Sequence, residues 1–271
     1  MPEMAQGLVA LVTGASSGIG AAVARRLARG GVRVALAARR RDRLDELASE
    51  IARAGGKACA FPVDLTQEKG REQLVEEVAA VWGTIDILVN NAGLGWYGYG
   101  CEMPWSRARE MIEVNGAAAV HLSLLVLPQM KHGGWGHIVN IGSIAGDIPS
   151  QGVALYCATK SFLEAFTTAL HRELRGTGVH VSLVKPGPVA TEFFDCSSCA
   201  GLRMPAERFA VSPARVAESV WHLLQHPRRA EYVPGWYRIV PWVELAFGWI
   251  MDRLGPLLLR RQAQIGNATH S

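Results

Sequence analysis

Short apolar runs alternate with longer segments of good helix formers along most of the chain. The runs consist mainly of valine, leucine, isoleucine and alanine, which is typical of strands buried on both faces of a sheet. The predicted strands cover residues 8–12, 32–38, 58–63, 85–89, 136–142, 179–185 and 230–233. The predicted helices cover residues 21–29, 42–54, 67–82, 107–130, 155–175 and 213–225.

Strands separated by helices predict an α/β fold. Parallel strands need crossover connections, and right-handed crossovers place helices on both faces of the sheet. We therefore expect a doubly wound parallel sheet of the Rossmann type in a three-layer α/β/α arrangement. No repeat, low-complexity segment or linker divides the 271 residues, so we expect one domain. Such sheets bind ligands beyond the carboxyl ends of their strands, and the motifs below fall there.

Composition excludes several classes of protein. Hydrophobic residues make up 49% of the chain and charged residues 19%, so the chain can bury a large core and is not of the disordered class. A net charge of +4 does not indicate a nucleic-acid partner. Five cysteines and the absence of a secretory leader predict free thiols in a reducing, cytoplasmic compartment. Cys196 and Cys199 have the spacing of a redox motif, but without a second pair we expect two loop thiols and no metal site.

A glycine-rich turn joins the first strand to the first helix. Thr13 and Gly14 follow the first run, and Gly18-Ile19-Gly20 opens the helix. Glycine lets the backbone approach a ligand, and the amides at a helix start attract phosphate. A tight turn of any α/β protein can look similar, but the flanking elements favour a nucleotide site. Asp64, after the third strand, is placed to contact adenine together with the backbone of Leu65; alternatively, it only caps the turn.

The residues after the second strand indicate which dinucleotide binds. An acid there usually accepts a hydrogen bond from the ribose 2′-hydroxyl of NAD(H), but this chain has Ala38-Arg39-Arg40. A guanidinium can hold a 2′-phosphate through a planar, charge-assisted fork. Arg39 and Arg40 therefore favour NADP(H) over NAD(H), with Arg39 the stronger candidate. We expect Arg41 and Arg43 to be solvated.

Three further residues have the types needed for proton transfer to an alcohol oxygen. Ser143 ends the fifth strand, and Tyr156 and Lys160 lie four residues apart on the next helix, so they share a face. A tyrosine is a poor base at neutral pH, but a nearby ammonium is expected to stabilise the phenolate and lower the tyrosine pKa. The pair can then move a proton to or from an oxygen to which Ser143 donates a hydrogen bond. Taken alone, the Tyr-x-x-x-Lys spacing equally fits an ordinary amphipathic helix.

Five motifs occur together in a fixed order. They are Thr13-Gly-x-x-x-Gly-x-Gly20, Asn90-Asn-Ala-Gly93, Ser143, Tyr156-x-x-x-Lys160, and Pro186-Gly187 with Thr191. The set resembles the classical short-chain dehydrogenase/reductase family from about Leu8 to Val233. No catalytic position departs from the family's pattern. The resemblance implies hydride transfer between NADP(H) and a carbonyl or alcohol, without a metal.

The resemblance also implies a role for each motif residue. The pyrophosphate would be held by Gly14, Ser16, Ser17, Gly18, Ile19 and Gly20. Asn90 and Gly93 would border the adenosine ribose, and their turn, with Asn91 and Ala92, would steady the sheet beside the cofactor. Asn115 would complete a tetrad with Ser143, Tyr156 and Lys160 and support a water-linked proton relay to the lysine. The nicotinamide end would be held by Tyr156, Lys160, Pro186, Gly187, Val189 and Thr191.

Two loops vary within such a family and set the substrate. Residues 94–99 and 192–204 are positioned to cover the pocket, and their apolar side chains favour an apolar ketone or secondary alcohol: steroid-like, retinoid-like, long-chain or aryl. Alternatively, these side chains close the domain's own core. A 3-oxoacyl carrier-protein reductase and a non-catalytic NADP(H)-binding sensor or scaffold are the rival functions. The intact tetrad argues against the sensor, and the arginine cluster lies at the adenosine end, away from where a carrier protein would dock.

Residues 234–271 extend beyond the domain predicted for residues 1–233. The segment 236–249 holds three of the eight tryptophans, flanked by arginines. This pattern fits a lid over the pocket, a subunit contact or a peripheral membrane contact. We favour a lid or a contact in a homodimer or homotetramer, because Pro241 and Pro256 are expected to break any long helix. No uncharged apolar run reaches the length of a membrane span.

Overall fold

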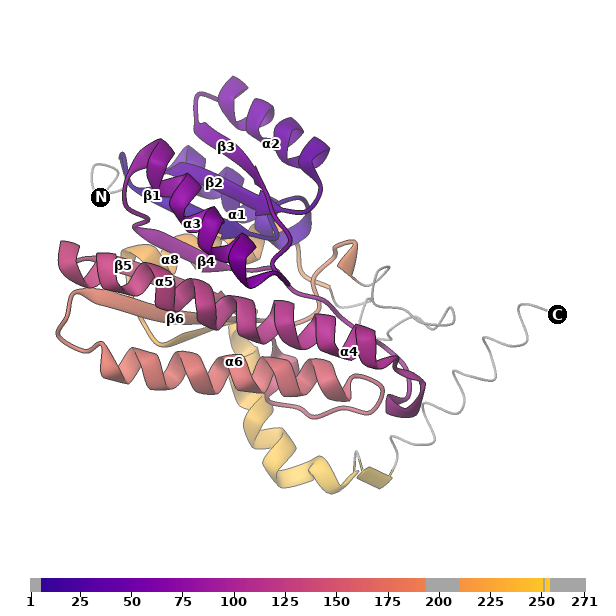
Figure 1. Ribbon diagram of the computed structural model, residues 1–271. Helices are drawn as coiled ribbons and strands as arrows, with labels where there is room; N and C mark the ends of the chain where they lie inside the picture. Colours follow the sequence, from indigo (N-terminus) through magenta and orange to yellow (C-terminus); the bar gives the residue numbers. More distant parts are fainter. Residues whose placement is uncertain (1–5, 194–209, 251, 254–271) are drawn as a thin grey trace.

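The computed structural model describes residues 6–193, 210–250 and 252–253, which form three layers around one sheet (Figure 1). The strands are β1 (Val9–Thr13), β2 (Arg33–Ala38), β3 (Lys57–Pro62), β4 (Ile87–Asn90), β5 (Gly136–Ile141), β6 (Val179–Pro186) and β7 (Ala230–Val233). The seven strands follow the order β3-β2-β1-β4-β5-β6-β7, and each neighbouring pair is parallel. The predicted parallel sheet is therefore confirmed.

Helices cover both faces of the sheet. One face carries α1 (Gly18–Arg29), α2 (Arg41–Arg53) and α8 (Pro213–Gln225); the other carries α3 (Glu68–Trp82), α5 (Ala118–Gly133) and α6 (Ala154–Glu173). Side chains alternate along each strand, so Ala10 and Val12 of β1 join the first core while Val9 and Leu11 join the second. The three-layer architecture is confirmed.

The long apolar helix predicted for residues 107–130 runs farther and is interrupted. It comprises α4 (Trp105–Ile112), a π-helical turn η3 (Glu113–Ala117) and α5, with Gly134 in the left-handed conformation after its end. The π turn displaces Asn115 from a regular helical position, which spacing alone does not predict. The combined helix Trp105–Gly133 is long and apolar enough to cross a membrane, but its most apolar window is 44% buried, and α5 packs on the sheet as a core helix does.

Two short 3-10 turns flank the site. The turn η2 (Gly100–Glu102) precedes α4, and η4 (Ile144–Gly146) follows β5. Both lie in connections at the carboxyl end of the sheet, which is where sheets of this type bind ligands.

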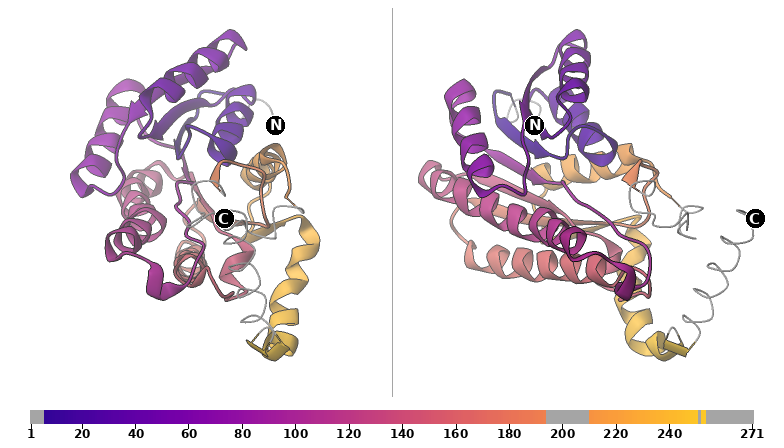
Figure 2. Two further views of the ribbon diagram at one scale, coloured as in Figure 1. Left: turned by 90° about the vertical axis from the view of Figure 1, so that its right-hand side faces the viewer. Right: turned by 45° about the vertical axis from the view of Figure 1, so that its right-hand side comes forward.

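A helix leaves the body of the molecule after β7. The turn η6 (Gly235–Ile239) leads into a helix over residues 240–250, which stands away from the three layers (Figure 2). Pro241 lies in the first turn of this helix, where no intrahelical amide bond is required, and the preceding residues 235–239 form a 3-10 turn. Pro241 therefore marks the start of the helix, in keeping with the expectation that it interrupts a longer one. Pro256, Cys196 and Cys199 lie outside the described residues. The domain boundary at Val233 stays a prediction.

Candidate active site

A cavity of about 790 Å³ opens at the carboxyl ends of the strands. Its wall combines the glycine turn after β1, the arginines after β2, the loop after β4, Ser143 after β5 and the end of β6. All the residues predicted to bind cofactor or to act in catalysis line it except Gly20, Asn90 and Asn115. Of the two predicted substrate loops, residues 94–96 and 192–193 line the cavity, residues 97–99 do not, and residues 194–204 lie outside the described residues. Segments far apart in the sequence therefore meet at one cleft.

The glycine turn leaves no room for side chains. Gly14 and Gly18 have φ values of 64° and 56°, which glycine adopts without strain. An added Cβ at Gly14 would lie 2.9 Å from Ala92 Cα, and one at Gly18 would lie 2.9 Å from Thr191 Cγ2. At Gly20 a Cβ would collide with the carbonyl oxygen of Gly14, so Gly20 holds the helix against the turn from behind. The bare backbone amides of this cradle fit a pyrophosphate.

The side chain of Asn90 is part of the core and does not line the cavity. Its Nδ2 donates to Ala119 O (3.2 Å), Ser123 Oγ (3.1 Å) and Asn140 Oδ1 (2.9 Å), and the residue is buried. As the last residue of β4 it faces α5, so strand alternation turns the next residue the other way. Asn91 accordingly reaches the glycine turn, where its Nδ2 donates to Thr13 O at 2.9 Å. The side chain of Asn90 thus ties β4 to α5 and β5, and its position beside the ribose stays a prediction.

Arg40, rather than Arg39, faces the phosphate cradle. Its Nη2 donates to Ser16 Oγ (3.0 Å) and Ser17 Oγ (2.9 Å). Arg39 instead pairs with Glu110 at 3.1 Å, and its side chain is 61% exposed. Both arginines line the cavity, but the two serine contacts fix the guanidinium of Arg40 next to the turn. Of the two predicted arginines, Arg40 is therefore the one held beside the turn, and the binding of a 2′-phosphate by either stays a prediction.

Glu192 was predicted only as the first residue of a substrate loop, yet it lies among the arginines at the edge of the cleft. Its carboxylate pairs with Arg40 (3.2 Å) and Arg43 (2.7 Å). The hydrogen bond from Arg43, followed by that from Arg40, lowers the pKa of Glu192. Arg43 is solvent-exposed as expected, with 38% of its side chain accessible, but it also pairs with this carboxylate. The available signal was an acid directly after Thr191, on the segment that faces the arginine cluster.

Asp64 and Leu65 reach the cavity wall but already have local partners. Asp64 Oδ1 accepts a hydrogen bond from the Thr66 amide at 3.0 Å, which is the capping contact of a turn. Leu65 O accepts a bond from Arg71 Nη1 at 2.8 Å. The second oxygen of Asp64 and the amide of Leu65 are the groups left to face an adenine.

Ser143, Tyr156 and Lys160 converge at the other end of the cavity. The side chain of Ser143 lies beside that of Tyr156, where it acts to lower the tyrosine pKa, and Lys160 Nζ lies 5.7 Å from the centre of the tyrosine ring. Lys160 Nζ also donates to Ile141 O at 2.8 Å. Removal from water raises the pKa of Tyr156 to about 12, against the effect of Ser143, and burial lowers the pKa of Lys160 to about 8. Burial thus outweighs the lowering expected of a nearby ammonium, and at neutral pH the phenol of Tyr156 is protonated.

Asn115 joins the catalytic helix to the loop after β4. Its Nδ2 donates to Thr159 Oγ1 (3.0 Å) and Leu94 O (2.9 Å), and its Oδ1 accepts from the Leu94 amide at 2.7 Å. The residue is buried on the π turn, so these bonds satisfy its amide. Asn115 does not bond to Lys160 directly, and a relay between them remains a prediction.

The sequence matches the model of the short chain dehydrogenase family over residues 8–198. The chain belongs to the short-chain dehydrogenase/reductase family. It is 36% identical over 223 residues to the NADP-dependent 3-hydroxy acid dehydrogenase YdfG of Escherichia coli strain K12, covering 79% of this chain and 88% of that one. A metagenomic short-chain oxidoreductase solved with NADP is 38% identical, with a TM-score of 0.69 over 81% of this chain and 90% of that one. The closed form of serine dehydrogenase with NADP+ is 33% identical, with a TM-score of 0.76 over 83% and 94%.

A buried lysine connects the elements that carry the catalytic groups of this short-chain dehydrogenase. Lys185, at the end of β6, is 0% exposed and pairs with Asp147 (2.5 Å) and Glu164 (2.6 Å). Burial alone would lower the pKa of Lys185, but the two carboxylates raise it overall. Asp147 lies four residues after Ser143, and Glu164 lies four after Lys160 on the same face of α6. The lysine therefore fixes the Ser143 loop relative to the Tyr156 helix.

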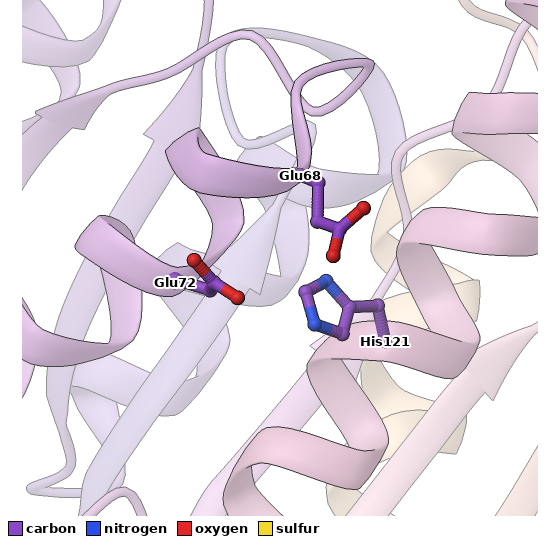
Figure 3. Close-up of side chains that lie close together, drawn as sticks. All are labelled: Glu68, Glu72 and His121. Atoms are coloured by element: carbon purple, nitrogen blue, oxygen red, sulfur yellow. The ribbon is translucent and has the colours of Figure 1, made fainter.

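Three possible metal ligands lie together outside the cleft. Figure 3 shows Glu68 and Glu72 of α3 directed towards His121 of α5. The buried side chain of Arg71 donates from Nε to His121 Nδ1 at 3.1 Å. A metal-bound neutral histidine needs its other ring nitrogen as a donor, and here that nitrogen accepts from a cation. We therefore assign no metal to this cluster.

Proposed function

We propose that this dehydrogenase interconverts a small-molecule carbonyl compound and its secondary alcohol with NADP(H). The observation that carries the proposal is one cavity shared by the glycine cradle, Arg40 and the Ser143–Tyr156–Lys160 group. Bound NADP(H) supplies or accepts the hydride. Arg40 would bind the 2′-phosphate together with Ser16 and Ser17, to which its guanidinium donates, and the amides of the glycine turn would bind the pyrophosphate.

Tyr156 would move the proton. During reduction its hydroxyl gives a proton to the carbonyl oxygen while the carbonyl carbon receives the hydride, so the alcohol forms and a phenolate remains. Ser143 holds the same oxygen by a hydrogen bond. The neighbouring ammonium of Lys160 stabilises the phenolate in this low-polarity site. Oxidation follows the reverse order.

The wall around Tyr156 favours an apolar substrate. It includes Trp96, Ile148, Val153 and Phe193, and the ring of Phe193 lies 5.5 Å from that of Tyr156. These side chains exclude water and give an aryl, long-chain or polycyclic ketone an apolar surface. Hydroxy acids are the second substrate class, because two similar proteins are named as 3-hydroxy acid and serine dehydrogenases.

Turnover with a substrate panel tests the substrate class. Apolar ketones with NADPH or NADH, and 3-hydroxy acids including serine with NADP+ or NAD+, would be followed by absorbance of the reduced nucleotide. We expect kcat/KM to be highest for an apolar ketone with NADPH. A preference for hydroxy acids would replace the apolar substrate class while leaving the mechanism unchanged.

Tyr156→Phe tests the mechanism. The variant keeps the ring and its contact with Phe193 but lacks the transferable proton, so we expect kcat to fall by about 100-fold or more. Nucleotide affinity, measured by fluorescence titration, should stay close to that of the wild type. Undiminished turnover would contradict the role of Tyr156. Wild-type protein that binds NADPH but turns over no substrate would instead support a sensor.

A further inference from the structure

Exposed apolar side chains are concentrated on the segment that follows β7. Seven of them lie within fourteen positions: Trp236, Ile239, Trp242, Val243, Leu245, Phe247 and Trp249. We call these seven the apolar face. Trp242 is 72% exposed and Leu245 81%, although residues of these types are usually covered. The helix that carries most of them, residues 240–250, projects from the body of the enzyme (Figure 2).

The helix is amphipathic, but its apolar side faces solvent and its charged residue lies on the more buried side. Val240, Glu244 and Gly248 follow one another at four-residue spacing and form its more buried row. Glu244 is the only charged residue between positions 240 and 250, and it belongs to this inward row. The opposite side presents tryptophan, leucine and phenylalanine to solvent. A surface helix of a globular protein has the reverse arrangement, so this side is built to meet an apolar partner.

The lid expected from the sequence is not what the described residues form. None of the described residues after Phe193 lines the cofactor and substrate cavity. The base of the segment nevertheless touches the cavity wall, because the buried ring of Tyr237 occupies the space that a side chain at Gly187 would need. The apolar face therefore begins beside the end of β6 and points outward from it.

Basic side chains adjoin the base of the apolar face. A groove between α8 and β7 is lined by Arg215, Arg228, Arg229 and Arg238. Its acids are engaged: Glu218 pairs with Arg26, and Glu231 pairs with Arg228 and His222. Arg215, Arg229 and Arg238 are exposed and form no ion pair with any residue that the structure describes. Apolar and cationic surfaces thus lie side by side.

We propose that this surface docks the enzyme onto an anionic lipid bilayer. Tryptophan and phenylalanine on an exposed helix fit the boundary between headgroups and acyl chains, and arginines attract anionic headgroups. Beyond the described residues the sequence again combines apolar and basic residues, with Leu257-Leu258-Leu259 followed by Arg260-Arg261. A second copy is a poorer occupant, since a two-fold contact would bring the arginines of both copies to the same interface. Docking also brings the cleft close to a phase that concentrates apolar substrates.

Flotation with vesicles tests the proposal on the full-length chain. The vesicles would contain either phosphatidylcholine alone or equal parts of phosphatidylcholine and phosphatidylglycerol. We expect the wild type to bind the mixed vesicles and to be released by high salt. The triple variant Trp242→Gln, Leu245→Gln, Trp249→Gln should lose at least about tenfold in partition coefficient. Arg229→Gln with Arg238→Gln should lose about fivefold per arginine on mixed vesicles only.

Trp105→Gln is the matched control. Trp105 is 71% exposed but lies on α4, so its loss should leave vesicle binding unchanged. Turnover of a water-soluble carbonyl should be unchanged in all these variants, which separates docking from catalysis. The proposal is overturned if the wild type ignores both kinds of vesicle, or if the triple variant binds them equally well. It is also overturned if the triple variant instead dissociates a dimer in sedimentation experiments, because a second copy then covers the face.

Discussion

At the scale of the residue, motif spacing predicted which side chains reach the cleft better than it predicted their partners. Ser143, Tyr156 and Lys160 line the cavity as the spacing indicates. Asn90 turned out to be a core amide, because the direction of a side chain at a strand end depends on where the strand stops. Which of Arg39 and Arg40 faces the glycine turn likewise depends on how the backbone turns between the end of β2 and the start of α2. A motif gives no information on either.

The assignment of the 2′-phosphate to Arg40 can be tested by Arg40→Ala. Losing a charge-assisted contact should weaken NADPH binding by about tenfold or more while NADH binding changes little. Arg39→Ala is the matched control, and it should have a smaller effect because Arg39 is more exposed and is paired with Glu110. Fluorescence titration of both nucleotides measures the change. A larger loss in the Arg39 variant would return the role to Arg39.

Burial of Lys160 predicts a pH dependence of stability. Its pKa falls to about 8 in the folded enzyme, so above that pH the unfolded chain binds the proton more readily than the folded one. The penalty for burying the ammonium is therefore present at pH 7 and is relieved as pH rises through 8. This effect should add about 1.4 kcal/mol to the free energy of unfolding between pH 7 and pH 9.

Urea denaturation of the wild type and Lys160→Met at both pH values measures that difference. The methionine variant lacks the titrating group, so its free energy of unfolding should lose this contribution while other pH effects remain. Equal pH dependence in the two proteins would mean that Lys160 keeps an ordinary pKa.

At the scale of the element, the strands and helices were predictable because each carries its own apolar pattern. Helix α8 begins and ends where the sequence indicates, from Pro213 at its first turn to Gln225. The π turn at Asn115 was not predictable, since it is held by bonds to Leu94 and Thr159 from two other segments. The buried ion network of Lys185 was missed for the same reason: its partners are Asp147, which follows η4, and Glu164 of α6.

Lys185→Met tests how much that network fixes the elements around the site. Removing the ammonium leaves Asp147 and Glu164 close together without their cation, so we expect a loss of about 3–5 kcal/mol in the free energy of unfolding. Lys57→Met, at an exposed position on β3, is the control and should change stability by less than about 0.5 kcal/mol. Urea denaturation measures both. Similar stabilities would show that water replaces the lysine.

At the scale of the whole molecule, the sequence predicted the layers but not the surroundings of the last segment. Alternation of strands and helices determines the sheet, because each apolar strand needs cover on both faces. The helix over residues 240–250 does not follow this logic, since its apolar side faces outward and its one acid faces inward. Composition alone left a lid, a subunit contact and a membrane contact open. The direction in which the helix leaves β7 argues against a lid formed by the described residues. The choice between a subunit contact and a membrane contact is left to the vesicle and sedimentation experiments.

The carboxylate of Glu192 gives coenzyme selection a particular energetic form. Arg40 and Arg43 already have an anion between them, so a 2′-phosphate bound as proposed would compete with Glu192 for Arg40 and would not meet a bare cation. The preference for NADP(H) over NAD(H) would then equal the difference in free energy between the contact of Arg40 with the phosphate and its contact with Glu192. Added salt weakens both contacts, so discrimination between the two coenzymes should resist ionic strength better than either affinity does.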